Sequence, residues 1–543
     1  MTCFPYNQAV STIRTILQAA GSSRHEVMSV FSSTEMALNQ IKPSAGKIWS
    51  TENLSGMKKN IQAVQDRALA AEYLGLQQED FMAVTREAFH SMEILQEQRG
   101  PSSFVSIPDY WKAFNVKSTH ELWGYDASED RTAEELMLDE ETGKGLTFIK
   151  AELLPRSGLT FNELLSILKT QFFSSRLVIT TGNSNNVFTG RLDDMRLRCS
   201  TLEDSNSSKL TEYICHDLQA FIRLWRKVGW SITDLDAILS TLKRKSESEC
   251  DLPFPSRKVA MTGSFGSDFY FRAQSTISPQ SVENLAAVKR LVEMYQIEPS
   301  RLQPLWGNID TNGPGSLYAS LFLPARMTKM DPVFKADTEG KYLKFAHKIM
   351  FGQHKQVILA TLRVLEKDLP ALYKSSGLES DPVLTLGNIS AIYRTSVFCK
   401  LIGIEAAEYP TFCKTFQDQD FFEDPRATLR TLEKWRMFQE AGWTVHELAG
   451  ATDITVDDEL KTRVFRAIKK ILGGVAVVEK TFAIDGNEAQ ASSEDVSKFS
   501  SLIFDSSTAK LVSQLIEGKP KFTLVSVVQL LILPMYREVV CFL

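Results

Sequence analysis

The sequence predicts a mainly α-helical protein, an irregular stack of antiparallel helix pairs joined by turns with glycine and Ser/Thr caps, with a small β insertion. Two patterns indicate the helices: a glycine-to-hydroxyl turn motif that recurs along the chain, and apolar residues repeated every three or four positions. A short β-branched stretch indicates the insertion. Of the 543 residues, 43% are hydrophobic and 23% are charged, which is typical of a globular protein with a core.

Each copy of the turn motif predicts a tight corner between two helices. A helix-like stretch ends at glycine; an apolar or small residue follows, then Ser or Thr, and an acidic residue three places on. Glycine adopts the left-handed conformation that ends a helix, and the hydroxyl and the acid together cap the next helix. The clearest copies are Gly158, Thr160 and Glu163; Gly229, Trp230, Ser231 and Asp234; and Gly442, Trp443, Thr444 and Glu447.

Other copies depart from this pattern. A further copy begins at Gly21. Looser ones begin at Gly75 and Gly403, where Gln or Glu replaces the hydroxyl residue, and a copy at 297–300 lacks the glycine. Because the copies are unevenly spaced, they do not predict a solenoid of fixed period. None carries a basic recognition helix, so we interpret them as helix hairpins without a DNA-binding role.

The segments between the corners have helical periodicity. Their apolar residues recur at spacings of three or four, which places one apolar stripe on one face of each helix. The clearest series are Ile214, Leu218, Phe221, Trp225 and Val228; Leu285, Val288, Leu291 and Tyr295; and Ile389, Tyr393, Val397 and Leu401. Asp424 followed by Pro425 predicts a helix start.

Several stretches interrupt the helical pattern. Residues 176–181 are β-branched and apolar, and a polar turn separates them from a second expected strand at 187–191, which places the β insertion at about 175–200. Residues 251–280 and 307–332 predict irregular connections. The resulting segments are a helical region 1–150, a helical region with the insertion 151–250, an irregular connection or inserted β element 251–280, a helical shell-like region 281–470 and a C-terminal helical region 471–543.

Charge and hydropathy argue against nucleic-acid and membrane partners. The chain has 61 Lys and Arg and 66 Asp and Glu, a formal net charge of −5, so it lacks the basic footprint of a nucleic-acid-binding protein. The longest apolar stretch, 522–535, contains Gln529 and Pro534 and is shorter than the ~20 residues of a membrane helix, so we expect no transmembrane segment. The N-terminus does not resemble a secretory signal, and we expect synthesis in the cytoplasm.

The residues capable of chemistry are dispersed, and we expect no cofactor, metal or catalytic site. Seven cysteines without a C-x-x-C pair predict reduced thiols packed in the core. Among the seven histidines, His347 and His354 could share a helix face, but two ligands are few for zinc. Glycine pairs at 143–145 and 263–266 lack the rest of a phosphate-binding loop. We interpret the acidic run 417–424 as a solvated loop before a helix.

A basic cluster surrounds Trp225. Arg223, Arg226 and Lys227 flank it, but a nucleic-acid surface would interleave more basic and aromatic residues over a longer stretch. We therefore expect a solvated basic helix face with Trp225 in the core. The aromatic residues at corners and connections are expected to pack there, with a subunit interface as the alternative role: Trp230, Trp306 and Trp443.

Residues 221–236 carry a block, Arg-Leu-Trp-Arg-Lys-x-Gly-Trp-Ser, that resembles one in the A subunits of insecticidal toxin complexes and in the related virulence plasmid A proteins. It contains Arg223, Trp225, Arg226, Gly229, Trp230 and Ser231. Other blocks follow in the family's order: 153–165 with Gly158, 304–310 with Trp306, Gly307 and Asp310, 316–323, 331–334, 389–394 with Tyr393 and Arg394, and the corner at Gly442 and Trp443. Together the blocks cover roughly residues 60–450.

The resemblance implies a non-catalytic part of the N-terminal helical shell of such a subunit. Family members assemble into a homo-oligomeric bell whose helical shell encloses a translocation channel, while separate subunits supply the toxic enzyme. The implied partners are further copies of this chain or other toxin complex subunits, with release from the cell as a toxin component; the host receptor stays unspecified. The family's receptor-binding modules and channel helices have no recognisable counterpart here, so we do not expect this chain to form a pore alone.

Two other functional classes stay open at this point. The chain could be a free-standing, truncated helical interaction module without pore activity, which the reading frame downstream of it would distinguish from a shell segment. It could also be an enzyme of unrecognised type, which a stoichiometric metal or nucleotide in the purified protein would indicate.

Overall fold

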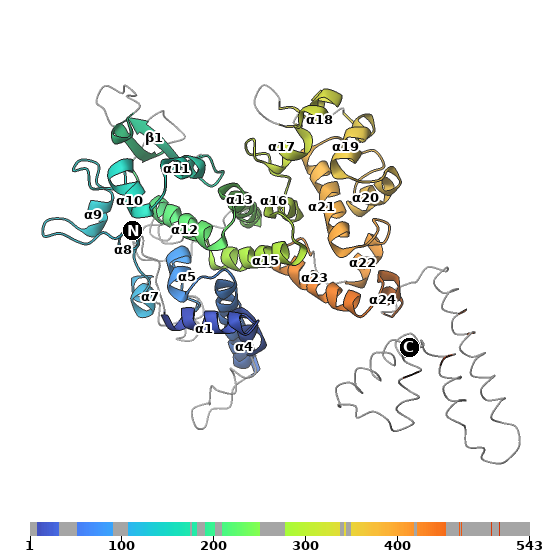
Figure 1. Ribbon diagram of the computed structural model, residues 1–543, viewed down its shortest axis with the longest axis horizontal. Coiled ribbons are helices and arrows are strands. Elements are labelled where there is room, and N and C mark those ends of the chain that lie inside the picture. The colour runs from blue at the N-terminus through green and yellow to red at the C-terminus, as the bar shows by residue number, and fades with distance from the viewer. Residues whose placement is uncertain are drawn as a thin grey trace, which may run out of the picture. The chain divides into compact units, whose positions relative to one another are not determined.

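The computed structural model confirms the predicted class. In the residues that it describes, the protein is mostly helical and has one two-stranded antiparallel sheet (Figure 1). The described residues are 8–31, 51–90, 107–173, 176–181, 191–200, 209–249, 277–336, 342–343, 349–416 and 421–451, together with Arg466, Lys469, Ser501 and Lys510.

The chain divides into two compact units. Unit 1 comprises residues 1–401 and 419–432, and unit 2 comprises residues 402–418 and 433–543. The segment boundaries expected from the sequence stay a prediction, and residues 251–276 of the expected connection lie outside the described residues.

The N-terminal part of unit 1 is built on one long helix. Helix α4 packs along α15, Pro279–Tyr295, and α1 and α2 are held on α4 by the carboxylate of Glu72, which accepts two hydrogen bonds of 2.8 Å from Arg14 and also binds Arg24. The elements here are α1 Gln8–Ala19, α2 Arg24–Phe31, α4 Thr51–Tyr73, α5 Gln78–Thr85, α7 Ile107–Phe114, α8 Thr119–Trp123 and α9 Ala133–Met137.

The loop that follows α9 is organised by one buried carboxylate. Asp139 accepts hydrogen bonds from the Thr142 N–H at 2.8 Å, from its hydroxyl at 2.6 Å and from Arg131 at 2.9 Å. Burial by itself would raise the pKa of Asp139, but these donors outweigh it and lower the pKa to about 2. A Cβ at Gly145 would lie 2.0 Å from the Asp139 carbonyl oxygen, so the loop requires glycine there.

The β insertion pairs strand β1, Leu177–Thr181, with strand β2, Met195–Cys199. The expected second strand at 187–191 is wrong for Arg191, which precedes a 3-10 turn; residues 187–190 lie outside the described residues. In β2 the apolar residues are buried and the arginines between them are partly exposed, a period-two pattern that marks a half-buried strand. The neighbouring elements are η1 Ile149–Leu153, which is a π-helical turn, α10 Leu154–Ser157, α11 Phe161–Leu168 and η2 Leu192–Asp194.

Helix α12, Glu212–Val228, packs against α5 and α8, and α13, Ile232–Glu249, packs against α15. All residues of α12 from Cys215 to Leu224 are buried, including Arg223, which is 3% exposed. Trp225 is only partly buried. The expectation of a solvated basic face with Trp225 in the core is therefore wrong, because a carboxylate on α5 supplies Arg223 with a partner inside the protein.

The second half of unit 1 contains shorter elements. The stretch 307–332, expected to be irregular, includes two helices, α17 and α18, because Ser316 accepts a hydrogen bond from the Ala319 N–H and caps the first of them. The elements are α15 Pro279–Tyr295, α16 Pro299–Leu302, η3 Gln303–Leu305, α17 Leu317–Phe322, α18 Ala325–Met330, η4 Pro332–Phe334, η6 Phe351–His354, α19 Lys355–Leu362, η7 Glu366–Asp368, α20 Leu369–Ser375 and α21 Leu386–Ile402.

Helix α23, Pro425–Glu440, starts in unit 1 and ends in unit 2. As the sequence predicts, Asp424 caps it by accepting a hydrogen bond of 2.6 Å from the Ala427 N–H. Of the acidic run before it, 417–420 lie outside the described residues. In unit 2, α22, Tyr409–Thr415, packs against α24, Val445–Ala451, and Phe412 meets Trp435 edge to face at 5.5 Å between ring centroids.

The predicted helix corners form. Gly21, Gly158, Gly229 and Gly442 have φ between 64° and 81°, in the left-handed region that ends a helix. The hydroxyl–acid caps also form at the three clearest copies: the hydroxyl oxygens of Thr160, Ser231 and Thr444 accept hydrogen bonds of 3.0 to 3.3 Å from the N–H of Glu163, Asp234 and Glu447.

The copy at 297–300 forms a corner without glycine. Gln296 takes the left-handed role with φ 51°, and the Ile297 N–H reaches back to the Val292 carbonyl at 3.3 Å. Pro299 occupies the first turn of the next helix, where its missing N–H costs nothing. A corner that the motif search missed follows α8, where Gly124 has φ 75°.

The buried core follows the predicted stripes in part. Leu285, Val288 and Leu291 of α15 are buried, but Tyr295 is only partly so. Cys199, Cys215 and Cys399 are buried thiols, as expected, and Cys413 is half-buried. Within the part of the chain that the structure describes, no helix has the length and apolar character needed to cross a membrane.

Replacing glycine by alanine should have opposite effects on stability at two positions, one at a helix end and one inside a helix. Gly229→Ala should lower the free energy of unfolding by about 1–2 kcal/mol, because an L residue is strained at its φ of 76°. Gly56→Ala, inside α4 with open space where its Cβ would lie, should raise it by about 0.5–1 kcal/mol. Urea unfolding followed by circular dichroism measures both, and changes of the same sign would contradict the corner geometry.

The Asp139 loop predicts a pH-dependent contribution to stability. A carboxyl group with a lowered folded-state pKa stabilises the protein above its unfolded pKa, near 4, and loses this contribution as pH falls towards about 2. Asp139→Asn should therefore destabilise by about 1–3 kcal/mol at pH 7 and progressively less from pH 4 downward. Unfolding measured between pH 7 and pH 3 checks this, with the exposed Asp126→Asn as control; an Asp139→Asn deficit that does not shrink in acid would contradict it.

Candidate functional site

Two basic residues of the 221–236 block bind backbone carbonyls at the corners of other helices. Arg226 donates from Nη2 to the Gly158 carbonyl at 2.9 Å, and Lys227 donates from Nζ to the Gly75 carbonyl at 3.3 Å. Each carbonyl lies just beyond the C-terminal end of a helix, where carbonyl oxygens have no helical partner and the helix dipole favours positive charge. Helix α12 is thus fastened to two corners that lie far away in the sequence.

Backbone carbonyls of the block at 304–310 are also bound by a basic side chain from another helix. Arg394 of α21 donates to the carbonyls of Pro304 and Gly307, both at 2.9 Å. Trp306 is buried, and its indole N–H donates to the Thr428 hydroxyl on α23 at 2.9 Å. A Cβ at Gly307 would lie 2.8 Å from the Thr241 methyl carbon, so glycine permits this close approach to α13.

Further helix ends use the same device, which we call corner contacts: a side chain from one element binds the exposed carbonyls at the end of another. Arg156 binds the Trp123 and Gly124 carbonyls after α8. Lys400 binds the carbonyls of Leu362 and Arg363 at the end of α19, and burial lowers the pKa of its ammonium. In unit 2, the Trp435 and Gln439 side chains both donate to the Ile402 carbonyl.

A buried ion cluster fixes α12 against α5. Asp80, which is 0% exposed, accepts from Arg223 at 3.4 Å and from Lys227 at 3.0 Å. A third contact is local: Asp80 Oδ2 also accepts from the Gln77 N–H at 3.3 Å and so caps α5. Asp80 therefore joins a helix cap to two cations on a neighbouring helix, and removing it would leave buried Arg223 without this carboxylate.

Other buried polar groups surround α12. His216 Nε2 donates to the Val84 carbonyl at 3.2 Å, because a carbonyl oxygen can only accept. Burial, with Arg86 and Arg223 nearby, holds the pKa of His216 well below its usual value. Arg176 binds the buried Asp217 at 2.5 Å.

The other residues predicted from the sequence to matter differ in burial and lie in different elements. Asp310 accepts from Gln171 at 2.7 Å and from the Asn312 N–H at 3.1 Å, so it joins the loop after α11 to the 304–310 block. Tyr393 is buried, which raises the pKa of its phenol to about 12. Trp230 and Trp443 are half-buried beside their corners. The set is distributed through the helical framework and does not converge on one cleft.

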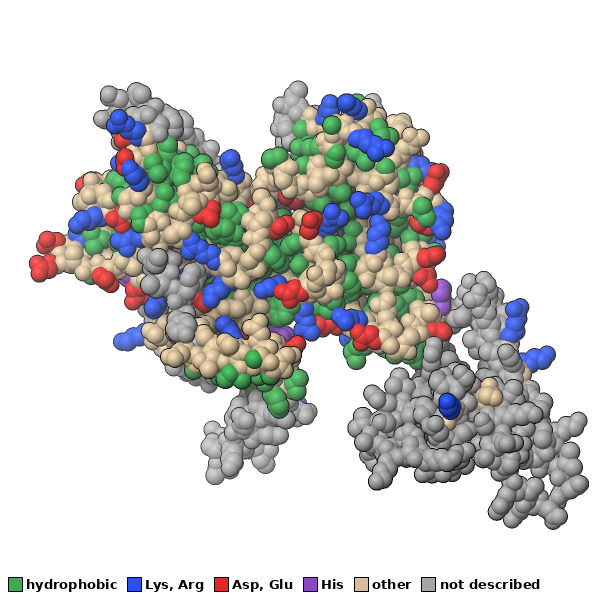
Figure 2. All heavy atoms as spheres, viewed as in Figure 1, with side chains coloured by type: hydrophobic (Ala, Val, Ile, Leu, Met, Phe, Trp, Pro, Cys, Tyr) green, Lys and Arg blue, Asp and Glu red, His purple; other side chains and the backbone are tan. Residues whose placement is uncertain are grey.

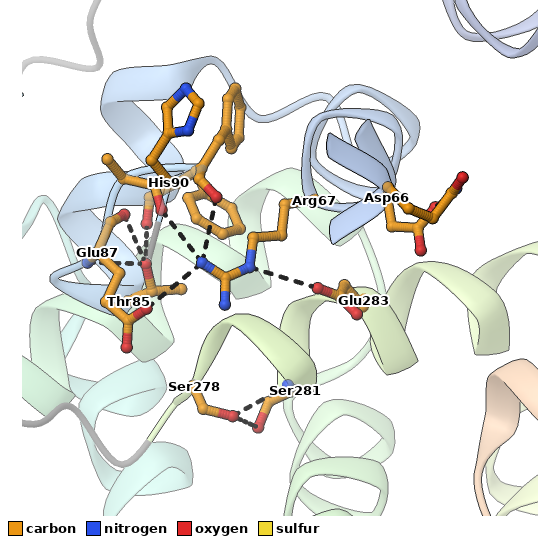
Figure 3. Close-up of polar contacts among 12 residues, drawn as sticks. Asp66, Arg67, Thr85, Glu87, His90, Ser278, Ser281 and Glu283 are labelled. Carbon is orange, nitrogen blue, oxygen red and sulfur yellow. Dashed lines mark hydrogen bonds and ion pairs between the residues drawn. The ribbon is translucent and has the colours of Figure 1, made fainter. Parts of the chain in front are cut away.

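A second ion network links α4, α15 and α23. Arg67 lies between the carbonyl of Phe89, at 3.2 Å, and the carboxylate of Glu283, at 3.7 Å (Figure 3). Glu283 also binds Arg426, which in turn lies 3.3 Å from Asp424. Burial raises the pKa of Glu283, although the two arginines oppose this shift.

This network borders a pocket of about 340 Å³ in unit 1. Its walls come from α2, α4, α15 and α23, and they include Asp66, Glu283, Arg290, Arg426 and Arg430. His25 and Tyr73 lie in its wall with their rings edge to face at 4.8 Å. Burial, aided by Arg290, lowers the pKa of His25, so this imidazole is mostly neutral at pH 7.

No protein-family model and no curated protein shows significant similarity to this chain. In the described parts of the chain, no three His, Cys, Asp or Glu side chains are grouped closely enough to hold a metal ion. The chemistry visible in these residues is hydrogen bonding and ion pairing between helices, together with one charged pocket.

Sequence reasoning missed Asp80, Glu283 and the pocket. Asp80 follows Gln77 at the capping-box spacing, within a stretch whose sequence predicts only a loose corner. The burial of Arg223 requires a carboxylate elsewhere in the protein, but the sequence by itself does not reveal that burial. Glu283 carries no local signal, because its partners lie on α4 and α23, far away in the sequence.

The buried cluster predicts a large effect of neutralising Asp80. Asp80→Ala should lower the free energy of unfolding by about 3–5 kcal/mol, because it strands Arg223 and Lys227 without their carboxylate. Glu298→Ala removes the partner of an exposed pair with Arg301 and should cost at most about 1 kcal/mol. Chemical unfolding of both variants checks the contrast, and equal losses would show that the Asp80 cluster contributes no more than a surface pair.

Proposed function

We propose that this chain is a structural and assembly protein, a segment of helical wall comparable to the shell of toxin complex A subunits. In this role it builds an oligomer from further copies of itself or from other subunits of such a complex, and it is released from the cell as a toxin component. It performs no catalysis of its own.

The observation that carries the proposal is the role of the block residues in the corner contacts. Arg226, Arg394 and Trp306 each join two parts of the chain that are more than 60 residues apart in sequence. The two arginines bind carbonyls at helix ends and Trp306 binds the Thr428 hydroxyl, and such cross-links fix the shape of a framework. A wall that encloses a channel needs such a fixed shape, and internal cross-links between helices supply it.

The distribution of charge supports the same proposal. Many arginines are engaged inside the protein, by Asp80, Glu72, Glu283 and Asp217. On the face shown in Figure 2, basic and acidic side chains are interspersed with apolar ones. A mixed surface of this kind suits contact with other protein subunits better than contact with a polyanion.

Light scattering coupled to size-exclusion chromatography tests the proposal on the full chain. We expect a particle whose mass is a whole-number multiple of 61.0 kDa and which persists on dilution, since closed oligomers have a fixed number of subunits. Negative-stain images of that peak should show a closed ring or bell.

A particle of 61.0 kDa at every concentration tested would contradict autonomous assembly and favour a free-standing interaction module. A continuous rise of mass with concentration would indicate open-ended aggregation instead of a closed shell. Asp80→Ala serves as a matched variant, because loss of the α5–α12 cluster should weaken the assembled state together with the fold.

A further inference from the structure

The pocket of unit 1 has an apolar floor. Ala70 of α4 and Ala286 and Ala287 of α15 are buried there, where the two helices pack closely. Leu69 and Leu429 add larger apolar walls from α4 and α23. Small side chains on the floor leave space above them, and the volume of about 340 Å³ lies at the lower end of the range for small-molecule pockets.

The charges at the pocket are unequal. Arg290, Arg426 and Arg430 line it against two carboxylates, Asp66 and Glu283. Glu283 is already bound by Arg67 and Arg426, as the close-up in Figure 3 shows for Arg67, and the Asp66 carboxylate accepts from Gln62 at 2.7 Å. The lining thus has one more guanidinium group than carboxylate, and Arg430 is exposed at the rim.

We propose that this pocket binds a small amphipathic organic anion, a carboxylate or sulfonate attached to an apolar body. The apolar body would lie on the alanine floor, and the anion would face the arginines, whose planar donors match the geometry of such groups. Inorganic phosphate carries the charge but nothing to bury against the floor. This site is independent of the assembly role, because its residues take no part in the corner contacts.

The test uses the full chain and 1-anilinonaphthalene-8-sulfonate, an amphipathic anion whose fluorescence rises on binding. We expect saturable binding of one probe per chain. Arg430→Gln should weaken it about tenfold, through loss of a charged hydrogen bond, and Ser29→Trp, at the exposed rim on α2, should weaken it similarly by filling the entrance. Arg301→Gln, which removes a positive charge elsewhere on unit 1, should leave the affinity unchanged.

Two further measurements make the outcome decisive. Phenylacetate should displace the probe, whereas inorganic phosphate at the same concentration should not; equal displacement by phosphate would overturn the amphipathic assignment. Helix α1 exposes Ile16, which is 61% accessible and offers the probe another apolar surface. Loss of binding in Ile16→Gln, or unchanged binding in both Arg430→Gln and Ser29→Trp with native circular dichroism, would overturn the site.

Discussion

A helix that ends abruptly leaves carbonyl oxygens without partners, and the framework of this protein depends on how those oxygens are satisfied. Glycine turns allow each helix to stop, but the turn itself accounts for only part of the exposed carbonyls. At several helix ends of this chain, a side chain from another helix binds further carbonyls, as Arg226 does at Gly158 and Trp435 does at Ile402. The same contact both completes the helix end and fixes the position of the neighbouring helix.

Burial of charge follows from this arrangement. Basic residues near the C-terminal end of α12 bind carbonyls at helix ends and carboxylates. Arg223 is buried and pairs with Asp80 inside the protein. A buried pair adds little net stability compared with apolar residues, but it discriminates strongly against arrangements that separate the charges. We therefore infer that the ion clusters around Asp80 and Glu283 help to specify which helices meet.

The proposed assembly role and the proposed anion pocket draw on different parts of unit 1. The corner contacts join helices to the ends of other helices within the framework. The pocket lies where α4 and α15 leave space above small side chains. In a rigid helical framework such a space persists, since the close packing of helices on either side prevents it from collapsing. A ligand that bound there would bridge α2, α4, α15 and α23 and would stabilise their arrangement.

Local patterns in the sequence determined the helical class, the glycine corners and their caps, because each depends on residues within one or two turns. Thr160 with Glu163 and Gly229 with Ser231 could be predicted for this reason. The sequence also predicted a second strand, but at 187–191 and not at the position of β2. Contacts between distant segments decided the rest. The burial of Arg223, the partial burial of Trp225 and the grouping of Arg67, Glu283 and Arg426 follow from which helices meet, and no local rule specifies that choice.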